Sequence, residues 1–233
     1  MKPRAVICDV YRTILEILPA PADADARWQE LGRTTFGAGK VPDLTVFNDL
    51  CRAEIARDHE DARRRGIAFP EVQWPRIVGS VLPEFAEMEA SKQSDFILAG
   101  QALTRGLRLL PGAADLLRHW HEAGLPLGIA SNAQAYTFDE LATLLGPAGL
   151  EPGIFSPDLV LWSWQLGFSK PDPYFFQTLL ARLKARGLAA GEVLMVGDRA
   201  DNDIAPARAA GLMTWHLHPQ GDGDWRALRD ALN

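Results

Sequence analysis

The feature that most constrains the fold is an alternation of short apolar segments with segments of helical spacing, which begins near residue 113. Several of these segments end at a glycine or a proline. The predicted order is helix 113–123, strand 125–130, strand 159–162, helix 174–186, strand 193–196, helix 204–210 and strand 213–217. Such an alternation is typical of a parallel sheet with helices on both faces, so the sequence predicts an α/β fold.

The first part of the chain contributes one more strand and a separate helical segment. An apolar run at residues 4–8 ends in Asp9 and predicts a strand that is buried on both faces. Helical spacing then dominates as far as residue 104, with a clear helix over residues 52–66 and no convincing strand. We therefore expect an α/β core made of residues 1–16 and 105–233 and an inserted helical domain made of residues 17–104.

Composition excludes several classes of partner and location. The 233 residues include 30 acidic and 24 basic side chains, a net charge of −6, so nothing attracts the protein to nucleic acid or to anionic lipid. No apolar run approaches the length of a membrane helix or of a signal sequence. The two cysteines, one of them inside an apolar run, do not indicate a disulfide framework. We expect a cytoplasmic protein without membrane or nucleic-acid partners.

Polar residues stand where the predicted strands end. Asp9 follows the first strand, Ser131 and Asn132 follow the strand at 125–130, and Asp198 follows the strand at 193–196. In a parallel α/β sheet, ligands bind at the carboxyl ends of the strands. Lys170, in the segment Lys-Pro-Asp-Pro, precedes a predicted helix and brings a positive charge to this acidic end. The sequence thus predicts a polar site at this edge of the sheet.

Taken together and in this order, these residues resemble the four motifs of the haloacid dehalogenase superfamily. The motifs are Asp-Val-Tyr-Arg-Thr at residues 9–13, Ser-Asn at 131–132, Lys170 in Lys-Pro-Asp-Pro, and Gly-Asp at 197–198 with Asp203. The resemblance implies a Rossmann-like parallel core flanked by helices, with the inserted segment as a helical cap. It also implies a hydrolase that forms an aspartyl-enzyme intermediate.

The resemblance assigns a role to each motif residue. Asp9 would be the nucleophile, and Mg²⁺ would be held by Asp9, Asp198 and the backbone carbonyl of Tyr11. Asp203 would orient Asp198 or a metal-bound water. The transferred group would be bound by Thr13 and Ser131, positioned by Asn132 and balanced in charge by Lys170.

Two positions in the first motif depart from the superfamily's phosphatases. Those enzymes carry an acid-base aspartate where this chain has Tyr11, and a tyrosine is a poor acid or base at neutral pH. Tyrosine at this position is typical of the 2-haloacid dehalogenases, which work without metal and lack the Gly-Asp pair at 197–198. Arg12 stands where glycine is usual, and it is a candidate to bind an anionic substrate.

Three functions therefore stay open. The first is an Mg²⁺-dependent phosphatase for a small, anionic phosphorylated metabolite, which the intact Asp198 favours. The second is a metal-independent 2-haloacid dehalogenase, which Tyr11 favours. The third is a catalytically weak member that binds a ligand without turnover, because the missing acid has not been replaced.

Overall fold

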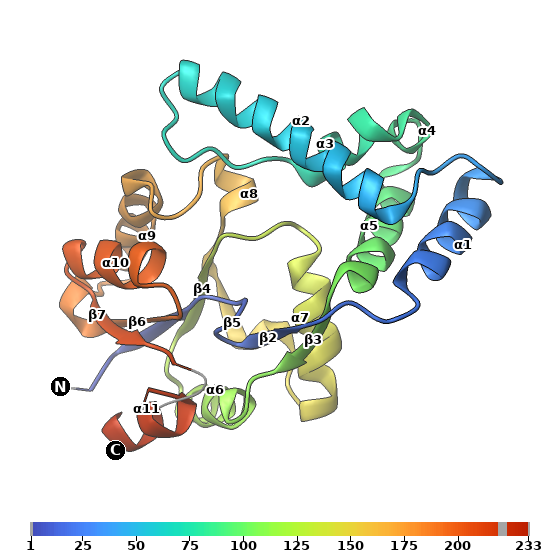
Figure 1. Ribbon diagram of the computed structural model, residues 1–233. Helices are drawn as coiled ribbons and strands as arrows, with labels where there is room; N and C mark the ends of the chain where they lie inside the picture. The colour runs from blue at the N-terminus through green and yellow to red at the C-terminus, as the bar shows by residue number, and fades with distance from the viewer. Residues whose placement is uncertain (1, 219–222, 233) are drawn as a thin grey trace. The chain divides into compact units, whose positions relative to one another are not determined.

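The computed structural model of the protein describes residues 2–218 and 223–232 (Figure 1). The chain forms two compact units. One unit combines the residues up to Glu16 with the residues from Arg108 onward, and the other is the continuous segment Ile17–Leu107. Sequence analysis put the second boundary at 104/105.

The first unit is built on a five-stranded sheet in the order β5-β4-β1-β6-β7. Every neighbouring pair in it is parallel. The strands are β1 (Ala5–Cys8), β4 (Leu127–Ser131), β5 (Phe155–Trp162), β6 (Val193–Gly197) and β7 (Met213–His216). All residues of β1, β4 and β6 are buried, which explains why these strands read as continuous apolar runs without alternation. The predicted α/β fold with a Rossmann-like parallel sheet is confirmed.

Helices pack on the sheet of this unit. They are α6 (Ala113–Glu122), α7 (Thr137–Leu145), α8 (Ser163–Leu166), α9 (Pro173–Ala185), α10 (Ala205–Ala209) and α11 (Trp225–Leu232), and short 3-10 turns and a π-helical turn at Ala200–Ile204 complete the unit. Phe175 and Leu179 of α9 join Ile7 of β1 and Met195 of β6 in one buried apolar cluster. Because side chains alternate along a strand, the buried Val6 and Cys8 face the opposite side of the sheet.

The second unit is helical. It contains α1 (Ala24–Phe36), α2 (Leu44–Arg64), α3 (Trp74–Val81), α4 (Pro83–Ala86) and α5 (Ala90–Thr104). Its centre is aromatic, because the ring of Trp28 lies 4.6 Å from that of Phe47 and 5.6 Å from that of Phe96, between ring centroids. The helix expected over 52–66 begins earlier, at Leu44.

The chain passes between the two units through a short two-stranded sheet made of β2 (Leu15–Leu18) and β3 (Gly106–Leu109). Sequence analysis did not predict these two four-residue strands. Arg108 Nε donates a hydrogen bond of 2.6 Å to Glu16 Oε2 across this pair. Among residues 2–218 and 223–232, no helix is both long enough and apolar enough for a bilayer crossing.

Candidate active site

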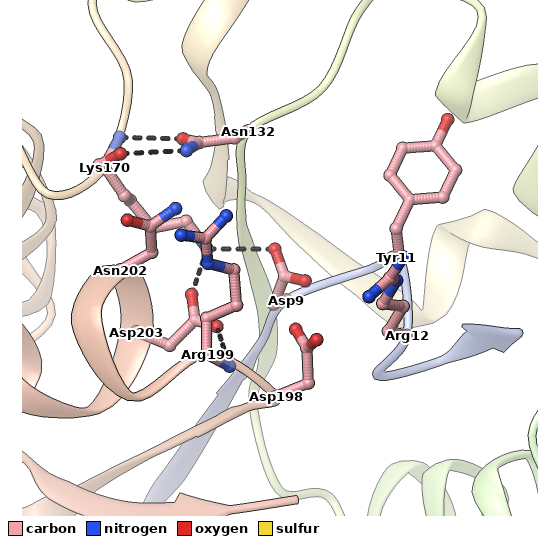
Figure 2. A pocket seen from close by; sticks show the side chains of 9 residues that line it. All are labelled: Asp9, Tyr11, Arg12, Asn132, Lys170, Asp198, Arg199, Asn202 and Asp203. Carbon is pink, nitrogen blue, oxygen red and sulfur yellow. Dashed lines mark hydrogen bonds and ion pairs between the residues drawn. The ribbon is translucent and has the colours of Figure 1, made fainter. Parts of the chain in front are cut away.

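A polar cavity of about 310 Å³ lies where the strands of the first unit end (Figure 2). Asp9 reaches it directly after β1, Asn132 directly after β4 and Asp198 directly after β6. Adjacent parallel strands bring these residues together although they are far apart in the sequence. The residues that line the cavity are Asp9, Tyr11, Arg12, Asn132, Lys170, Asp198, Arg199, Asn202 and Asp203.

A buried lysine links two of the carboxylates. Lys170 Nζ donates hydrogen bonds to Asp9 Oδ1 at 2.9 Å, to the carbonyl oxygen of Ala130 at 2.6 Å and to Asp203 Oδ1. All three ammonium protons therefore have an acceptor. Burial lowers the pKa of Lys170, but the charges of Asp9 and Asp203 outweigh it and hold that pKa above its ordinary value. The lysine is a fixed positive charge within the site.

The local sequence around Lys170 explains its placement. Asp172 caps α9 by accepting a 2.9 Å hydrogen bond from the Tyr174 backbone N–H, and Pro173 begins the helix. Asn132 holds the lysine from the other side, since its amide donates to the Lys170 carbonyl at 2.9 Å and accepts from the Lys170 N–H at 2.7 Å. The Asn132 side chain is thereby committed to positioning Lys170.

Burial and the charge of Asp203 raise the pKa of two neighbouring carboxyls in this enclosed space. Burial raises the pKa of Asp9 to about 6, Lys170 acts against this increase, and the charge of Asp203 adds to it. Burial and the charge of Asp203 also raise the pKa of Asp198. A cation beside these carboxylates would favour their ionised forms.

The loop after β6 brings Asp203 next to Asp198. A π-helical turn over Ala200–Ile204 carries Asp203, whose Oδ2 accepts a 3.1 Å hydrogen bond from the Arg199 backbone N–H. Gly197 permits this approach, because a Cβ built on it would lie 2.5 Å from Asp203 Oδ2. His216, at the end of β7, fixes the backbone here with a 2.8 Å hydrogen bond between its Nε2 and the carbonyl oxygen of Asp198.

One oxygen from each of Asp9, Asp198 and Asp203 lies within 4.8 Å of the other two. This is the group of possible metal-binding side chains that the described part of the chain provides. A set made only of carboxylate oxygens suits a hard cation such as Mg²⁺ better than a metal that prefers nitrogen or sulfur ligands.

Two buried hydroxyl groups, in the segments that follow Asp9 and precede Asn132, lack a hydrogen-bond partner among the described residues. They are Thr13 Oγ1 and Ser131 Oγ. Ser131 lies close enough to Asp9 to contribute to its pKa, although the geometry between them does not form a hydrogen bond. Buried hydroxyls without partners are uncommon, and a bound group that accepts hydrogen bonds would satisfy both.

The family model for haloacid dehalogenase-like hydrolases matches residues 4–211, which include every residue that lines the cavity. The chain belongs to this family. The expected hydrolase class and the superfamily membership are therefore confirmed.

Several known proteins are similar to this chain in sequence or in structure. A ribulose-1,5-bisphosphate 5-phosphatase from Halopiger xanaduensis is 37% identical over 118 residues, which cover 51% of this chain and 46% of the relative, so the match spans about half of each. A 2-haloacid dehalogenase structure from Pseudomonas syringae pv. Tomato DC3000 has a TM-score of 0.59 at 22% identity, covering 95% of this chain and 88% of that one. A HAD family enzyme from Bacteroides thetaiotaomicron, in complex with magnesium and inorganic phosphate, has a TM-score of 0.57 at 13% identity, covering 96% and 98%. The two structures establish the shared fold.

The side chain of Tyr11 is directed away from Asp9 (Figure 2). The Tyr11 hydroxyl lies 2.8 Å from Thr137 Oγ1 and donates a hydrogen bond to Glu140 Oε2, both in α7. Figure 2 shows the hydroxyl directed away from Asp9. The position of the phenol is therefore fixed by contacts with α7 and not by a contact with Asp9.

Several residues of the site were not found by sequence analysis. Thr137 and Glu140 contact Tyr11 across more than 120 positions of sequence, with separations of 126 and 129 residues. Arg199 and Asn202 line the cavity, and His216 supports Asp198. The position of Arg199 directly after the Gly-Asp pair was the available signal, whereas only the fold brings Glu140 to Tyr11.

Proposed function

We propose that this hydrolase is an Mg²⁺-dependent phosphatase that acts on a small phosphorylated metabolite through an aspartyl-phosphate at Asp9. The observation that carries the proposal is the grouping of Asp198 with Asp9 and Asp203, whose oxygens lie within 4.8 Å of one another beside the cavity. Three carboxylates packed together need a compensating cation beyond Lys170, and a phosphatase of this kind uses one.

The three carboxylates would have different roles at the metal, because their hydrogen bonds differ. Both oxygens of Asp203 already accept hydrogen bonds, Oδ1 from Lys170 and Oδ2 from the Arg199 N–H. Asp9 and Asp198 are therefore the better direct ligands, with the carbonyl of Tyr11 as the third, while Asp203 orients the others. When bound, Mg²⁺ neutralises negative charge on the oxygens of the transferred phosphoryl group.

The chain's own residues perform the two displacements. Asp9 attacks phosphorus, the bond to the leaving oxygen breaks, and the phosphoryl group remains bound to the Asp9 carboxylate; water then attacks phosphorus, releasing phosphate and regenerating Asp9. The unpartnered hydroxyls of Thr13 and Ser131 donate to the phosphoryl oxygens, and Lys170 offsets charge on the nucleophile.

The Tyr11 hydroxyl is bound to α7 and points away from Asp9 (Figure 2), so it does not supply the proton for the leaving group. Leaving groups that depart as stable anions do not need this proton. We therefore expect the enzyme to favour phosphate esters of acidic alcohols or phenols over esters of simple alkanols.

The remaining expectations follow from the same assignment. The helical unit Ile17–Leu107 acts as the cap and selects the substrate. The substrate is a small anionic molecule, and the reaction takes place in the cytoplasm, where the two buried thiols Cys8 and Cys51 stay reduced.

A 2-haloacid dehalogenase is the second candidate, and Tyr11 favours it. In that reaction Asp9 attacks carbon and halide leaves without a proton, so no general acid is needed. That reaction gives no role to Asp198, which faces the cavity beside Asp9.

The test is hydrolysis of p-nitrophenyl phosphate with and without Mg²⁺, since this leaving group scarcely needs an acid. We expect turnover that disappears with EDTA and in Asp9→Asn, and that requires a higher Mg²⁺ concentration in Asp198→Asn. Halide release from 2-chloropropionate, independent of metal and with no phosphatase activity, would establish the dehalogenase instead. Binding of phosphate esters without either activity would indicate the ligand-binding alternative.

A further inference from the structure

Arg12 occupies a backbone conformation that side chains other than glycine rarely adopt. Its φ is 59°, and it is the non-glycine residue with positive φ in the described part of the chain. The turn that imposes this conformation is fixed by hydrogen bonds, since the Arg12 N–H donates to the carbonyl oxygen of Leu15 at 2.5 Å and the Thr13 N–H donates to that of Val10 at 3.3 Å. A glycine would fit this turn without strain, so an arginine here needs a reason in its side chain.

The side chain of Arg12 differs from the other two cations that line the cavity. Lys170 is bound to Asp9 and Asp203, and Arg199 forms a two-pronged ion pair with Asp201 through Nε at 3.0 Å and Nη2 at 2.5 Å. The exposed guanidinium of Arg12 forms no ion pair with any residue in 2–218 or 223–232. It is the cavity cation left available for a ligand.

The position of Arg12 separates it from the groups assigned to the transferred phosphoryl. Figure 2 shows Arg12 beside Tyr11, on the opposite side of Asp9 and Asp198 from Lys170 and Asn132. A phosphoryl group at Asp9 would meet Lys170 on one side. The rest of the substrate, on the Arg12 side of the cavity, would meet a planar guanidinium that matches a carboxylate or a phosphate with two parallel hydrogen bonds.

We propose that Arg12 is a specificity-determining residue that binds a second anionic group of the substrate. Resting on the proposed phosphatase function, this narrows the substrate class to small phosphate esters with a carboxylate or a second phosphate away from the reacting phosphorus. Arg12 contributes selectivity between such esters and neutral ones, and the nucleophile and its metal stay as described.

The test measures how matched pairs of compounds inhibit hydrolysis of p-nitrophenyl phosphate. 3-Phosphoglycerate and glycerol 3-phosphate differ in a carboxylate against a hydroxymethyl group, and fructose 1,6-bisphosphate and fructose 6-phosphate differ in a second phosphate. In the wild-type protein we expect the member with two anionic groups, in at least one pair, to have an inhibition constant about 10-fold lower or more, as for a charge-assisted hydrogen bond. The pair with the larger ratio identifies the second group.

The variants are Arg12→Gly, Arg12→Lys and, as a matched control, Arg199→Met. Arg12→Gly suits the positive φ, so we expect it to fold at least as stably as the wild type. In Arg12→Gly the ratio of the two inhibition constants within a pair should fall to about one. Arg12→Lys should keep part of this ratio, because lysine retains the positive charge but lacks the two parallel donors of the guanidinium. Arg199→Met should keep the wild-type ratio, since that charge is already paired with Asp201.

Each outcome decides a separate question. If the wild type hydrolyses p-nitrophenyl phosphate but shows equal inhibition within both pairs, or if Arg12→Gly keeps the wild-type ratio, the role of Arg12 is refuted and the phosphatase stands. If no hydrolysis occurs, the proposed function fails, and calorimetric binding of the same pairs to wild type and Arg12→Gly still tests Arg12. A preference for the ligand with two anionic groups that is lost in Arg12→Gly would support the inference in either case.

Discussion

The hydroxyl of Tyr11 donates a hydrogen bond to Oε2 of Glu140, which ties the loop after Asp9 to α7. Both side chains lie in the same unit, and the hydroxyl also lies 2.8 Å from Thr137 Oγ1. An acid-base group must be free to exchange protons with the substrate, whereas this phenol is held by α7. This contact explains, in structural terms, why a tyrosine here does not simply replace an aspartate.

Restoring the acid should restore activity toward poor leaving groups. For Tyr11→Asp combined with Glu140→Gln, which avoids two adjacent carboxylates, we expect the kcat/KM for an alkyl phosphate to rise relative to that for p-nitrophenyl phosphate by about 10²-fold or more. The measurement is the ratio of the two values in the variant and in wild type. Tyr11→Phe with Glu140→Gln is the control, and an unchanged ratio in the aspartate variant would rule out a simple missing acid.

Removing the acceptor of Tyr11 should cost stability. Glu140 is buried, at 8% exposure, and in Glu140→Ala the Tyr11 hydroxyl loses that partner. We expect the free energy of unfolding in urea to fall by about 1–3 kcal/mol, and by less in Glu140→Gln, which still accepts a hydrogen bond. Equal losses in the two variants would show that the bond itself contributes nothing.

Lys170 should be more important for folding than an exposed ion pair. Its side chain is 2% exposed, and Lys170→Met leaves Asp9 and Asp203 buried without their cation. We expect a loss of about 3–5 kcal/mol in the free energy of unfolding. With Asp203→Asn added, the loss should be smaller than the sum of the two single losses by about 1–3 kcal/mol. Additive losses would mean that the two side chains do not interact energetically.

The same variant should respond to pH in a defined direction. Asp9 already has a pKa raised to about 6 in the folded protein, mainly by burial, and loss of the lysine charge raises that pKa further. A carboxyl with a raised pKa in the folded state destabilises the protein above that pKa and ceases to do so once protonated. Relative to wild type at each pH, the stability of Lys170→Met should therefore recover as the pH falls from the variant's higher Asp9 pKa toward about 6, the value in the wild type. Parallel pH profiles would contradict this.

A methyl group at Gly197 should disturb the carboxylates of the proposed metal site. The added Cβ would lie 2.5 Å from the side chain of Asp203, so the carboxylate or the strand must shift. We expect Gly197→Ala to lose about 1–3 kcal/mol of stability and to require more Mg²⁺ for half-maximal activity. Gly191→Ala is the matched control, because its Cβ would come no nearer than 4.0 Å to a neighbour, the carbonyl oxygen of Gly211. A similar change in both variants would rule out this explanation.

The sequence predicted the sheet because its physical cause is local. The runs that became β1 and β6 are apolar and short and are followed by turns, so burial on both faces can be read from them directly. The meeting of Asp9, Asn132 and Asp198 at one edge also follows from parallel strand order.

Other parts of the site depend on contacts that no local pattern records. The bond between Tyr11 and Glu140 joins residues 129 positions apart, and α7 carries no motif that marks Glu140. The double hydrogen bond from Asn132 to the backbone of Lys170 requires two loops to meet. The four-residue strands β2 and β3 are too short to show a period, and their pairing depends on the chain on both sides of the helical unit.

The strand order also has a consequence for how the protein is made. β1 leaves the ribosome before the other four strands of its sheet, yet it is the middle strand, between β4 and β6. Its apolar residues can gain their first partner strand only when residues 127–131 have been synthesised, and the second only with residues 193–197. The continuous helical segment Ile17–Leu107 can by then already form its aromatic centre. Late closure of a central parallel strand slows folding and exposes apolar edges to aggregation. Asp9, directly after β1, is thus synthesised before either of the strands that flank β1 and reaches its final environment only after both have formed.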